Sequence, residues 1–378
     1  MKIAIVKETT SLEKRVAATP DIVKKYIELG FEVGVEKDAG ISAYYTDDSY
    51  INSGAKIYNN VEDLISDADI ILKVNSVYNN GLGADNIALY KQNKIIIGFL
   101  KPLLNIDQIK DLAKNNINAF SVELIPRISR AQSMDALSSQ SNLAGYKSVI
   151  NAVNEFSRAI PMMMTAAGTI APAKVLILGA GVAGLQAIAT AKRLGAIVSA
   201  FDVRTAVKEQ VESLGAKFVE VETDKNVNNE TETGYAKEMS EEYKLKQKEL
   251  LENYIQNQDI VITTALIPGK KAPELISTKM VKSMKTGSII MDLAAEAGGN
   301  CSLTKANETI IEEGIKIIGP TDLPSQIPQD ASNLYAKNLF NFIKLMVKDK
   351  KLNVDWEDEI IKKSCVSNDG KIMNIGET

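Results

Sequence analysis

One stretch constrains the fold of this chain more than any other. An apolar run, KVLIL, leads directly into the glycine-rich sequence GAGVAG and then into a helical pattern, over residues 174–196. In a strand–turn–helix unit with this G-x-G-x-x-G spacing, Gly179 allows the tight turn, Gly181 lets the backbone approach a pyrophosphate, and Gly184 lets the helix pack on the strand. The helix N-terminus supplies N–H donors to the phosphates. We expect a dinucleotide-binding domain here; the alternative is a close-packed turn that binds nothing.

An acidic residue follows where such a domain requires one. Asp202 ends the next apolar strand, 18 residues beyond Gly184, and a carboxylate there can accept hydrogen bonds from both ribose hydroxyls of an adenosine. Its charge would repel a 2′-phosphate, which favours NAD over NADP. Arg204 lies two residues further on and can share a face with Asp202, because side chains alternate along a strand. An arginine in that place can neutralise a 2′-phosphate, so NADP stays open on these residues alone.

The rest of the chain alternates strand and helix patterns, which predicts an α/β fold with parallel sheets. Strands are expected at 2–6, 31–36, 69–74, 94–99 and 118–123, and in a second series at 174–178, 198–203, 217–220, 259–264, 287–292 and 315–318. Helical patterns cover 19–30, 142–160 and 331–347. We expect the last of these to return to the first domain, which makes that domain discontinuous: residues 1–137 with 325–378, and a second domain of 138–324.

Composition excludes several classes of protein. The net charge of −4 argues against nucleic acid as a partner, because phosphate binding needs a basic surface. Cys301 and Cys365 lie far apart and form no metal spacing and no disulfide framework, so we expect no metal and a reducing cytosol. The longest apolar windows are shorter than the about 18 residues that a membrane span needs. We expect a soluble protein without direct membrane insertion, which could still dock on a membrane partner.

The chain contains no histidine, the usual general acid or base near neutral pH. A dehydrogenase that acts on an alcohol or amine must move a proton as well as a hydride. Hydride transfer between two nicotinamide rings moves no proton and needs only orientation and close approach. The composition therefore favours the second kind of chemistry, although a missing residue type can also arise by compositional drift.

A polar segment before the glycine motif fits such a site. Residues 126–146 read PRISRAQSMDALSSQSNLAGY. In this interpretation Gln132 and Asp135 bond the carboxamide of a nicotinamide or its ribose, while Arg127 and Ser138 bond the carboxamide or a phosphate. The alternative is a capped linker, with Ser133 or Asp135 as a helix N-cap and the serines as turn formers. The spacing leaves both open.

A long polar insertion interrupts the second series of strands at 223–250. Such an insertion in a compact domain is commonly a lid or disordered. Gly234 permits a hinge beside Tyr235, an aromatic residue in polar surroundings, so we expect a mobile lid near 223–240. A solvated helix fits 238–250 equally well.

Several stretches carry a specific resemblance to a known family: PRISRAQSMDALSSQSNLAGYKSV, PMMMTAAGTIAPAKVLILGAGVAGLQAIATAKRLGA, TGYAKEMSEEY, DIVITTALIPGKKAP and DLAAEAGGN. Over essentially its whole length the chain resembles the NAD(H)-binding component of proton-translocating NAD(P) transhydrogenase. The resemblance implies two Rossmann-like, doubly wound domains and a homodimer that works at the inner, cytoplasmic face of a membrane through a membrane-spanning subunit. It implies Si-Re specific hydride exchange between NAD(H) bound here and NADP(H) on a partner component, coupled to proton translocation, in a form split into separate polypeptides.

The same resemblance implies roles for single residues. It places the nicotinamide near Arg127, Gln132, Asp135 and Ser138. It places the pyrophosphate and adenosine near Ala180, Gly181 and Val182, and near Asp202, Val203 and Arg204. It makes the segment around Tyr235 a lid and adds Gly234, Gln247 and Leu266 to the surroundings of the nucleotide.

The related enzyme to be distinguished is alanine dehydrogenase, which shares both domains. Its substrate site uses an arginine, a lysine, a histidine and an aspartate; Arg15 and Lys73 match the first two. The histidine position falls near Lys101, and the aspartate position is held by Glu296. Two changes of four, including the acid/base, make amino-acid oxidation the weaker alternative. An NAD-sensing module without catalysis is the non-enzymatic one.

Overall fold

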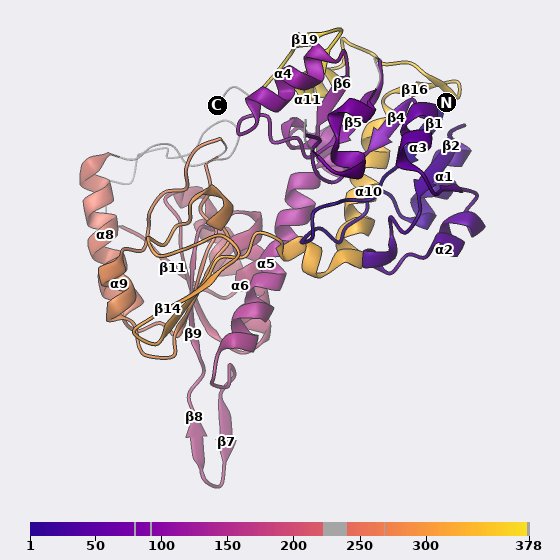
Figure 1. Ribbon diagram of the computed structural model, residues 1–378. Coiled ribbons are helices and arrows are strands. Elements are labelled where there is room, and N and C mark those ends of the chain that lie inside the picture. The colour runs from indigo at the N-terminus through magenta and orange to yellow at the C-terminus, as the bar shows by residue number, and fades with distance from the viewer. Residues whose placement is uncertain (79–80, 91–92, 222–239, 268, 376–378) are drawn as a thin grey trace. The chain divides into compact units, whose positions relative to one another are not determined.

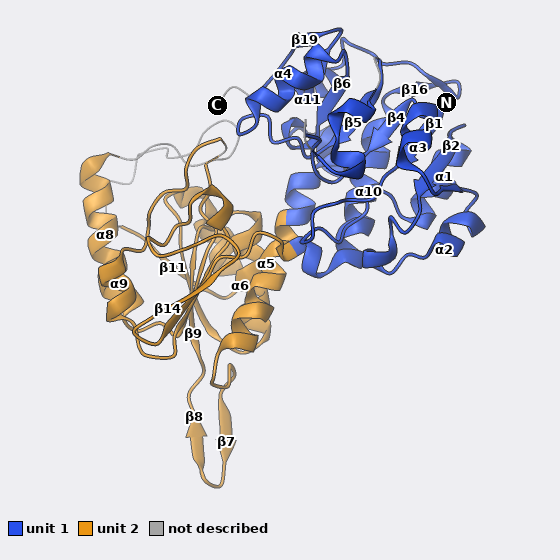
Figure 2. Cartoon of the chain, in the orientation of Figure 1, with its two compact units in different colours: residues 1–140, 324–378 blue, residues 141–323 orange. Residues whose placement is uncertain are grey.

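The computed structural model describes residues 1–375 except 79–80, 91–92, 222–239 and 268. They form two compact units, shown in Figure 2: residues 1–140 with 324–378, and residues 141–323. The first unit is built from two separate stretches of the chain. Helix α5 (Ala136–Glu155) runs through the boundary.

The first unit is a Rossmann-like sheet extended by antiparallel strands. Its order is β19-β18-β6-β5-β4-β1-β2-β3. The strands from β1 to β6 all pair in parallel, and their order reverses between β1 and β4. The strands are β1 (Lys2–Ile5), β2 (Glu32–Glu36), β3 (Lys56–Tyr58), β4 (Ile70–Leu72), β5 (Ile95–Gly98), β6 (Asn118–Ser121), β18 (Cys365–Asn368) and β19 (Lys371–Ile372). A separate hairpin joins β16 (Val347–Lys348) to β17 (Lys351–Leu352).

Helices cover both faces of this sheet, because successive side chains of its strands enter two different buried clusters. Ile3 and Ile5 pack with α1 (Pro20–Glu28), α10 (Pro328–Lys344) and α11 (Glu359–Ser364). Ala4 and Val6 pack with α3 (Val61–Asp67) and α4 (Ile106–Lys114). Strands buried on both faces are typical of parallel sheets. The short helix α2 (Asp47–Asn52) follows β2 in the chain.

The second unit repeats the same design around the glycine motif. Its order is β11-β10-β9-β12-β13-β15-β14, with β14 antiparallel at the edge. The strands are β9 (Lys174–Leu178), β10 (Ile197–Phe201), β11 (Lys217–Val219), β12 (Ile260–Thr263), β13 (Ile289–Asp292), β14 (Thr309–Glu312) and β15 (Ile315–Ile318). Helices α5, α6 (Val182–Arg193) and α7 (Lys208–Ser213) pack on one face, and α8 (Glu241–Ile255) and α9 (Thr278–Ser283) on the other.

The sequence-based prediction missed the antiparallel strands and the short parallel strand β3, and it misplaced the bounds of two helices. Helix α10 begins at Pro328 and ends at Lys344, not at 331 and 347. Strands β14, β18 and β19 are short and partly polar, and their partners are fixed by topology rather than by a local apolar run. Helix α5 begins at Ala136, not at 142, because the Asp135 carboxylate accepts a hydrogen bond from the Ser138 N–H at 2.8 Å. It ends at Glu155, not at 160, because Ile160 instead pairs with Ala173.

A hairpin projects from the second unit (Figure 1). It joins β7 (Met163–Thr165) to β8 (Gly168–Ile170), and every residue of both strands is exposed. Within the described part of the chain, the helices include none with the length and apolar character required to cross a bilayer.

Candidate functional site

The glycine motif forms the turn between β9 and α6 in the second unit, and each glycine meets a different environment. Gly179 has a φ of +101°, which only glycine adopts readily. A Cβ on Gly184 would lie 1.9 Å from the Gly179 carbonyl oxygen, so helix and strand pack too closely for any side chain. A Cβ on Gly181 would meet no atom nearer than the Arg204 Nη2, at 4.0 Å. Gly181 therefore leaves open space in which a ligand could approach the protein backbone.

This turn lies at the edge of the sheet where nucleotides bind in folds of this kind. Strand order reverses between β9 and β12, and ligands of open α/β sheets bind at the carboxyl ends of strands at such a reversal. Ala180 is buried in the turn, and Val182 is exposed at the first position of the twelve-residue helix α6. The start of α6 thus offers backbone N–H groups to an anion.

Asp202 is almost completely engaged by its own chain. Its Oδ2 accepts hydrogen bonds from the Ala180 N–H at 2.7 Å and from Arg204 Nη2 at 2.9 Å. Its Oδ1 accepts from the Arg204 N–H at 2.9 Å and from Arg204 Nε at 3.0 Å. Arg204 and Asp202 thus share a face, and their charges compensate each other beside the glycine turn. Val203 lies between them, half-buried.

Two further predicted residues belong to the same unit. Leu266 is 47% exposed just beyond β12, and Gln247 is buried on α8. The same helix carries a residue that sequence reasoning missed, Tyr243. Burial, and secondarily the carboxylates of Asp202 and Glu220, raise the pKa of Tyr243 to about 12. Its proximity to Asp202 could not be read from the sequence, because Tyr243 lies 41 positions further along the chain, within the polar insertion at 223–250.

The loop that carries Leu266 is held by a buried amide. Asn300 is fully buried, and its side chain accepts from the Ala265 N–H at 3.0 Å and donates to the carbonyls of Ala265 and Pro273 at 2.9 and 2.8 Å. Asp292 accepts from the Asn300 N–H at 2.8 Å. Thr264 in turn donates to the Gly179 carbonyl at 3.0 Å, so this loop and the glycine turn support each other.

The polar segment that precedes α5 belongs to the first unit. Gln132 lies in a 3₁₀ helix, η5 (Ser129–Met134), and Gln132 and Arg127 are exposed. Asp135 and Ser138 are half-buried, and the Ser138 N–H and Oγ both donate to the Asp135 carboxylate, at 2.8 and 2.6 Å. Asp135 therefore caps α5, and Gln132 stands exposed shortly before the cap.

The predicted site residues thus form two groups, one in each unit. Arg127, Gln132, Asp135 and Ser138 lie together in the first unit. Those of the second unit are Gly179, Ala180, Gly181, Val182, Gly184, Asp202, Val203, Arg204, Gln247 and Leu266. Gly234, Tyr235 and nearly all of the expected lid lie outside the described residues.

The first unit holds a buried ionic cluster at its own strand reversal. Lys73 is fully buried, with its Nζ 2.6 Å from Asp85 Oδ1 and 3.7 Å from Glu8 Oε1. Burial alone would lower the pKa of Lys73, but the neighbouring Glu8, Tyr90 and Asp85 raise it, so the ammonium stays charged. Burial raises the pKa of Glu8, against the opposing effect of Lys73.

Arg15 is compensated in the same way. Its Nε and Nη2 donate to the two oxygens of Glu13 at 2.8 and 2.7 Å, and its Nη1 donates to Gln140 Oε1 at 2.9 Å. The Arg15 guanidinium lowers the pKa of Glu13 although burial opposes it. The other two positions compared with alanine dehydrogenase are polar but different: Lys101 donates its N–H to Glu123 at 2.5 Å, and Glu296 is exposed.

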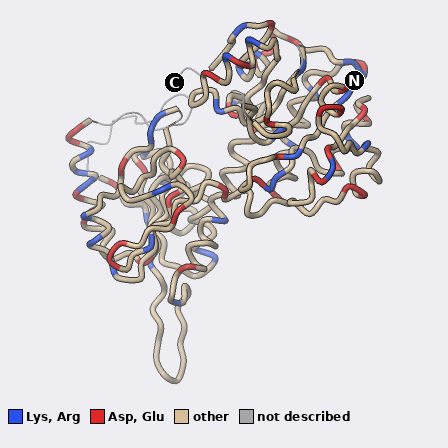
Figure 3. The backbone as a smooth tube through the Cα atoms, in the orientation of Figure 1, with Lys and Arg blue, Asp and Glu red and all other residues tan. Residues whose placement is uncertain are grey.

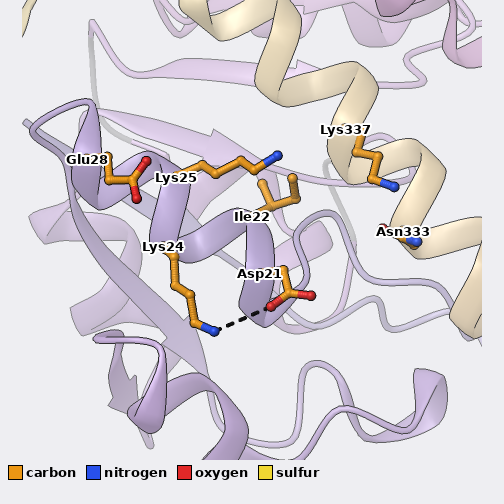
Figure 4. A pocket seen from close by; sticks show the side chains of 7 residues that line it. All are labelled: Asp21, Ile22, Lys24, Lys25, Glu28, Asn333 and Lys337. Atoms are coloured by element: carbon orange, nitrogen blue, oxygen red, sulfur yellow. Dashed lines mark hydrogen bonds and ion pairs between the residues drawn. The ribbon is translucent and has the colours of Figure 1, made fainter.

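Figure 4 shows the side chains that line a pocket on the first unit, which shares no residue with these groups. It is lined by α1 and α10, with Asp21 and Lys24 paired at 3.4 Å. Its walls carry mixed charges on long exposed side chains, and we assign it no ligand.

Comparisons with known proteins agree with this geometry. The N-terminal domain of the alanine dehydrogenase/PNT family matches residues 4–144, and its C-terminal domain matches residues 148–375. The chain belongs to the alanine dehydrogenase/PNT family. The first polypeptide of the NAD(P) transhydrogenase alpha subunit of Rhodospirillum rubrum is 53% identical over 376 residues, covering 99% of this chain and 98% of that protein.

Two solved structures match the chain over nearly its whole length. The transhydrogenase from Sinorhizobium meliloti matches with a TM-score of 0.85 and 42% identity over 99% of both chains. An L-alanine dehydrogenase matches with a TM-score of 0.81 and 23% identity, over 99% of this chain and 97% of that one, which concerns the fold alone. The alanine dehydrogenase/PNT family binds nicotinamide nucleotides, and within it the homology favours the transhydrogenase alpha subunit.

Proposed function

We propose that this chain is the NAD(H)-binding component of a proton-translocating transhydrogenase. It holds NAD(H) for direct, Si-Re specific hydride transfer to or from NADP(H) on a partner component. The observation that carries the proposal is the glycine turn beside a charge-compensated Asp202–Arg204 pair, in a chain 53% identical to a transhydrogenase alpha subunit. A compensated pair leaves no net positive charge for a 2′-phosphate, which supports NAD here and NADP elsewhere.

Each group of residues has a separate task in this proposal. Bound NAD(H) supplies the hydride at its nicotinamide ring. The α6 N-terminus and the Gly181 backbone hold the pyrophosphate. Asp202 accepts from the adenosine ribose in place of one of its hydrogen bonds from the Arg204 side chain. Arg127, Gln132, Asp135 and Ser138 orient the nicotinamide end. Because transfer between two such rings needs no proton donor, orientation and exclusion of water suffice, in agreement with a chain that has no histidine.

Two measurements test the proposal. Titration of the purified chain should show NADH binding at least about tenfold more tightly than NADPH, which corresponds to about 1.4 kcal/mol. Hydride exchange between NADH and an NADP analogue should appear only when the NADP(H)-binding component is added. Tighter binding of NADPH would overturn the proposal, and binding of NADH without any exchange would favour an NAD-sensing module.

The buried ionic cluster argues against an alanine-type dehydrogenase. Arg15 and Lys73 are the side chains that would hold a carboxylate substrate, but Glu13 and Asp85 already take up their charges. An amino acid would have to displace a buried carboxylate, which is costly in a low-dielectric interior. We expect no NADH formation when the chain is mixed with alanine and NAD; robust formation would restore the dehydrogenase alternative.

The exposed hairpin supports a homodimer. Met162, Met163, Met164 and Ile170 are all more than two-fifths exposed, and Figure 3 shows no charged residue along the hairpin. A two-stranded hairpin is marginally stable alone, and its open edges can pair with another chain. We propose that a second copy covers it. Met164→Asp should convert the dimer to a monomer in analytical ultracentrifugation; an unchanged dimer would place the interface elsewhere.

Membrane partners complete the proposal. Described helices too short or too polar for a bilayer support a component that is attached through a membrane-spanning subunit, at the cytoplasmic face. Proton translocation would then belong to that subunit, coupled to hydride transfer here.

A further inference from the structure

The segment that carries Gln132 is anchored by a helix from the far end of the chain. Helix α10 packs against η5. Ala131 and Met134 of η5 are buried in the core cluster that also contains Leu339 and Phe342 of α10. Apolar contacts of this kind fix the distance between the two helices but do not fix the rotation of a short 3₁₀ turn, because they are non-directional.

Hydrogen bonds from α10 fix the rotation of this 3₁₀ turn. Asn338 on α10 is buried, with 8% of its surface exposed. Its Nδ2 donates to the Ser133 carbonyl at 3.0 Å, and its Oδ1 accepts from the Ser139 Oγ at 2.8 Å. One planar amide therefore holds a point directly after Gln132 and a point directly after Ser138. Asn341 adds a second, more exposed donor to the Ser133 carbonyl at 3.1 Å.

Asp135 and Ser138, two of the residues assigned to the nicotinamide, lie between these two points, and Gln132 directly precedes the first of them. Between them the Asp135 carboxylate binds the Ser138 N–H and Oγ, so the segment is closed on itself and attached to α10 at both ends. We propose that Asn338 is a positioning residue for hydride transfer: its amide sets the orientation of Gln132 and Asp135 without touching the nucleotide. This inference rests on the proposed function.

Asn338→Asp tests the inference, because it keeps an acceptor for Ser139 and replaces the donor to the Ser133 carbonyl by an oxygen. A displacement of about 1 Å at a hydride-transfer site costs up to about a hundredfold in rate. We expect the exchange rate at saturating nucleotide, measured with the full chain and the NADP(H)-binding component, to fall at least about tenfold. The dissociation constant for NADH should change less than about twofold, because loss of an orienting interaction lowers the rate rather than the affinity.

A second readout needs no nucleotide. Backbone amides of residues 133–139 should exchange with deuterium faster in Asn338→Asp than in the unmodified chain, while those of the distant helix α4 should not change. Two matched variants separate positioning from stability. Lys337→Ala removes the exposed neighbour of Asn338 on the same helix. Leu112→Ala opens a cavity beside α4. Leu112→Ala should lower the thermal midpoint and leave the rate of hydride exchange at saturating nucleotide intact.

The outcomes are distinguishable. An unchanged rate and unchanged deuterium exchange in Asn338→Asp, beside an active unmodified chain, would overturn the positioning role alone. Equal losses of rate and NADH affinity would also overturn it, because they indicate uniform binding. No hydride exchange by the unmodified chain with its partner component would overturn the proposed function and this inference with it.

Discussion

Single residues near the glycine turn are held by charge compensation. Asp202 has only 8% of its surface exposed, yet its carboxylate is compensated by the guanidinium of the residue two positions on. The pair explains how an arginine can stand where it would otherwise attract a 2′-phosphate. The preference for NAD over NADP therefore depends on the combined charge of Asp202 and Arg204, not on Asp202 alone.

Removing one charge should shift that choice. In Asp202→Asn, Arg204 loses its compensating carboxylate and the adenosine ribose loses a strong acceptor. We expect NADH affinity to fall about tenfold and NADPH affinity to rise, as measured by fluorescence titration. Glu308→Gln, which removes a carboxylate from the exposed Lys305 pair, should alter neither affinity. An unchanged preference in Asp202→Asn would show that Arg204 does not reach the nucleotide.

The buried cluster of the first unit makes a different prediction, on stability. Asp85→Asn removes the nearer carboxylate partner of the fully buried Lys73 and leaves the more distant Glu8, at 3.7 Å. Breaking one partner of a buried ion pair costs about 3–5 kcal/mol, because the remaining charge is still desolvated. Urea unfolding should show a loss of this size. Lys110→Gln, which breaks an exposed pair with Asp107, should change the unfolding curve little; similar losses in both variants would contradict the argument.

At the scale of an element, different glycines of the β9–α6 turn are required for folding and for binding. Gly179 and Gly184 are required by backbone geometry and by the close approach of helix to strand. Gly181 has ordinary backbone angles, φ −78° and ψ −165°, and space in front of it. Of the three glycines, Gly181 is thus the one whose lack of a side chain serves ligand binding and not folding.

A pair of alanine substitutions tests this division. Gly184→Ala places a methyl group 1.9 Å from a carbonyl oxygen, so we expect a loss of several kcal/mol in unfolding free energy or failure to fold. Gly181→Ala should leave the thermal midpoint unchanged and weaken NADH binding about tenfold. Normal NADH affinity in a folded Gly181→Ala would show that the pyrophosphate does not approach this residue.

At the scale of the whole molecule, each unit has its own interior. Among the described residues, every buried cluster draws its members from one unit only. Units with separate cores can unfold separately. The chain contains one cysteine in each: Cys365 in the first unit and Cys301 in the second, both buried.

These thiols report on the two units independently. Burial raises the pKa of Cys301 to about 11 and that of Cys365 to about 12, above the value of about 8.5 for an unfolded thiol. The folded thiols therefore stay protonated at pH 8, and their stabilising contribution is lost only as pH rises above about 8.5 towards those values. At pH 8, iodoacetamide labelling followed by mass spectrometry should depend on unfolding.

Leu112→Ala, in the first unit, should accelerate labelling of Cys365 and not of Cys301; Met291→Ala, in the second unit, should do the reverse. Both substitutions remove buried side chains and should cost about 2–5 kcal/mol. Equal acceleration of both cysteines by either variant would mean that the units unfold as one.

Local rules explain which features were predictable. The sequence alone determined the alternation of strands and helices, the β9–turn–α6 unit and the acidic residue at the end of β10, because backbone angles, periodicity and the spacing of glycines act within a few neighbouring residues. The expectation of a discontinuous first domain followed from the order of the elements.

Only the tertiary structure decided what depends on distant partners. Asn338 meets the Ser133 carbonyl across 205 positions, β18 joins β6, and Asp202 lies close enough to Tyr243 to raise the pKa of its hydroxyl. The start of α5 was decided by which of the two candidate caps, Ser133 and Asp135, accepted the hydrogen bond from the Ser138 N–H. Such choices depend on the path of the folded backbone, which brings groups together irrespective of their spacing along the chain.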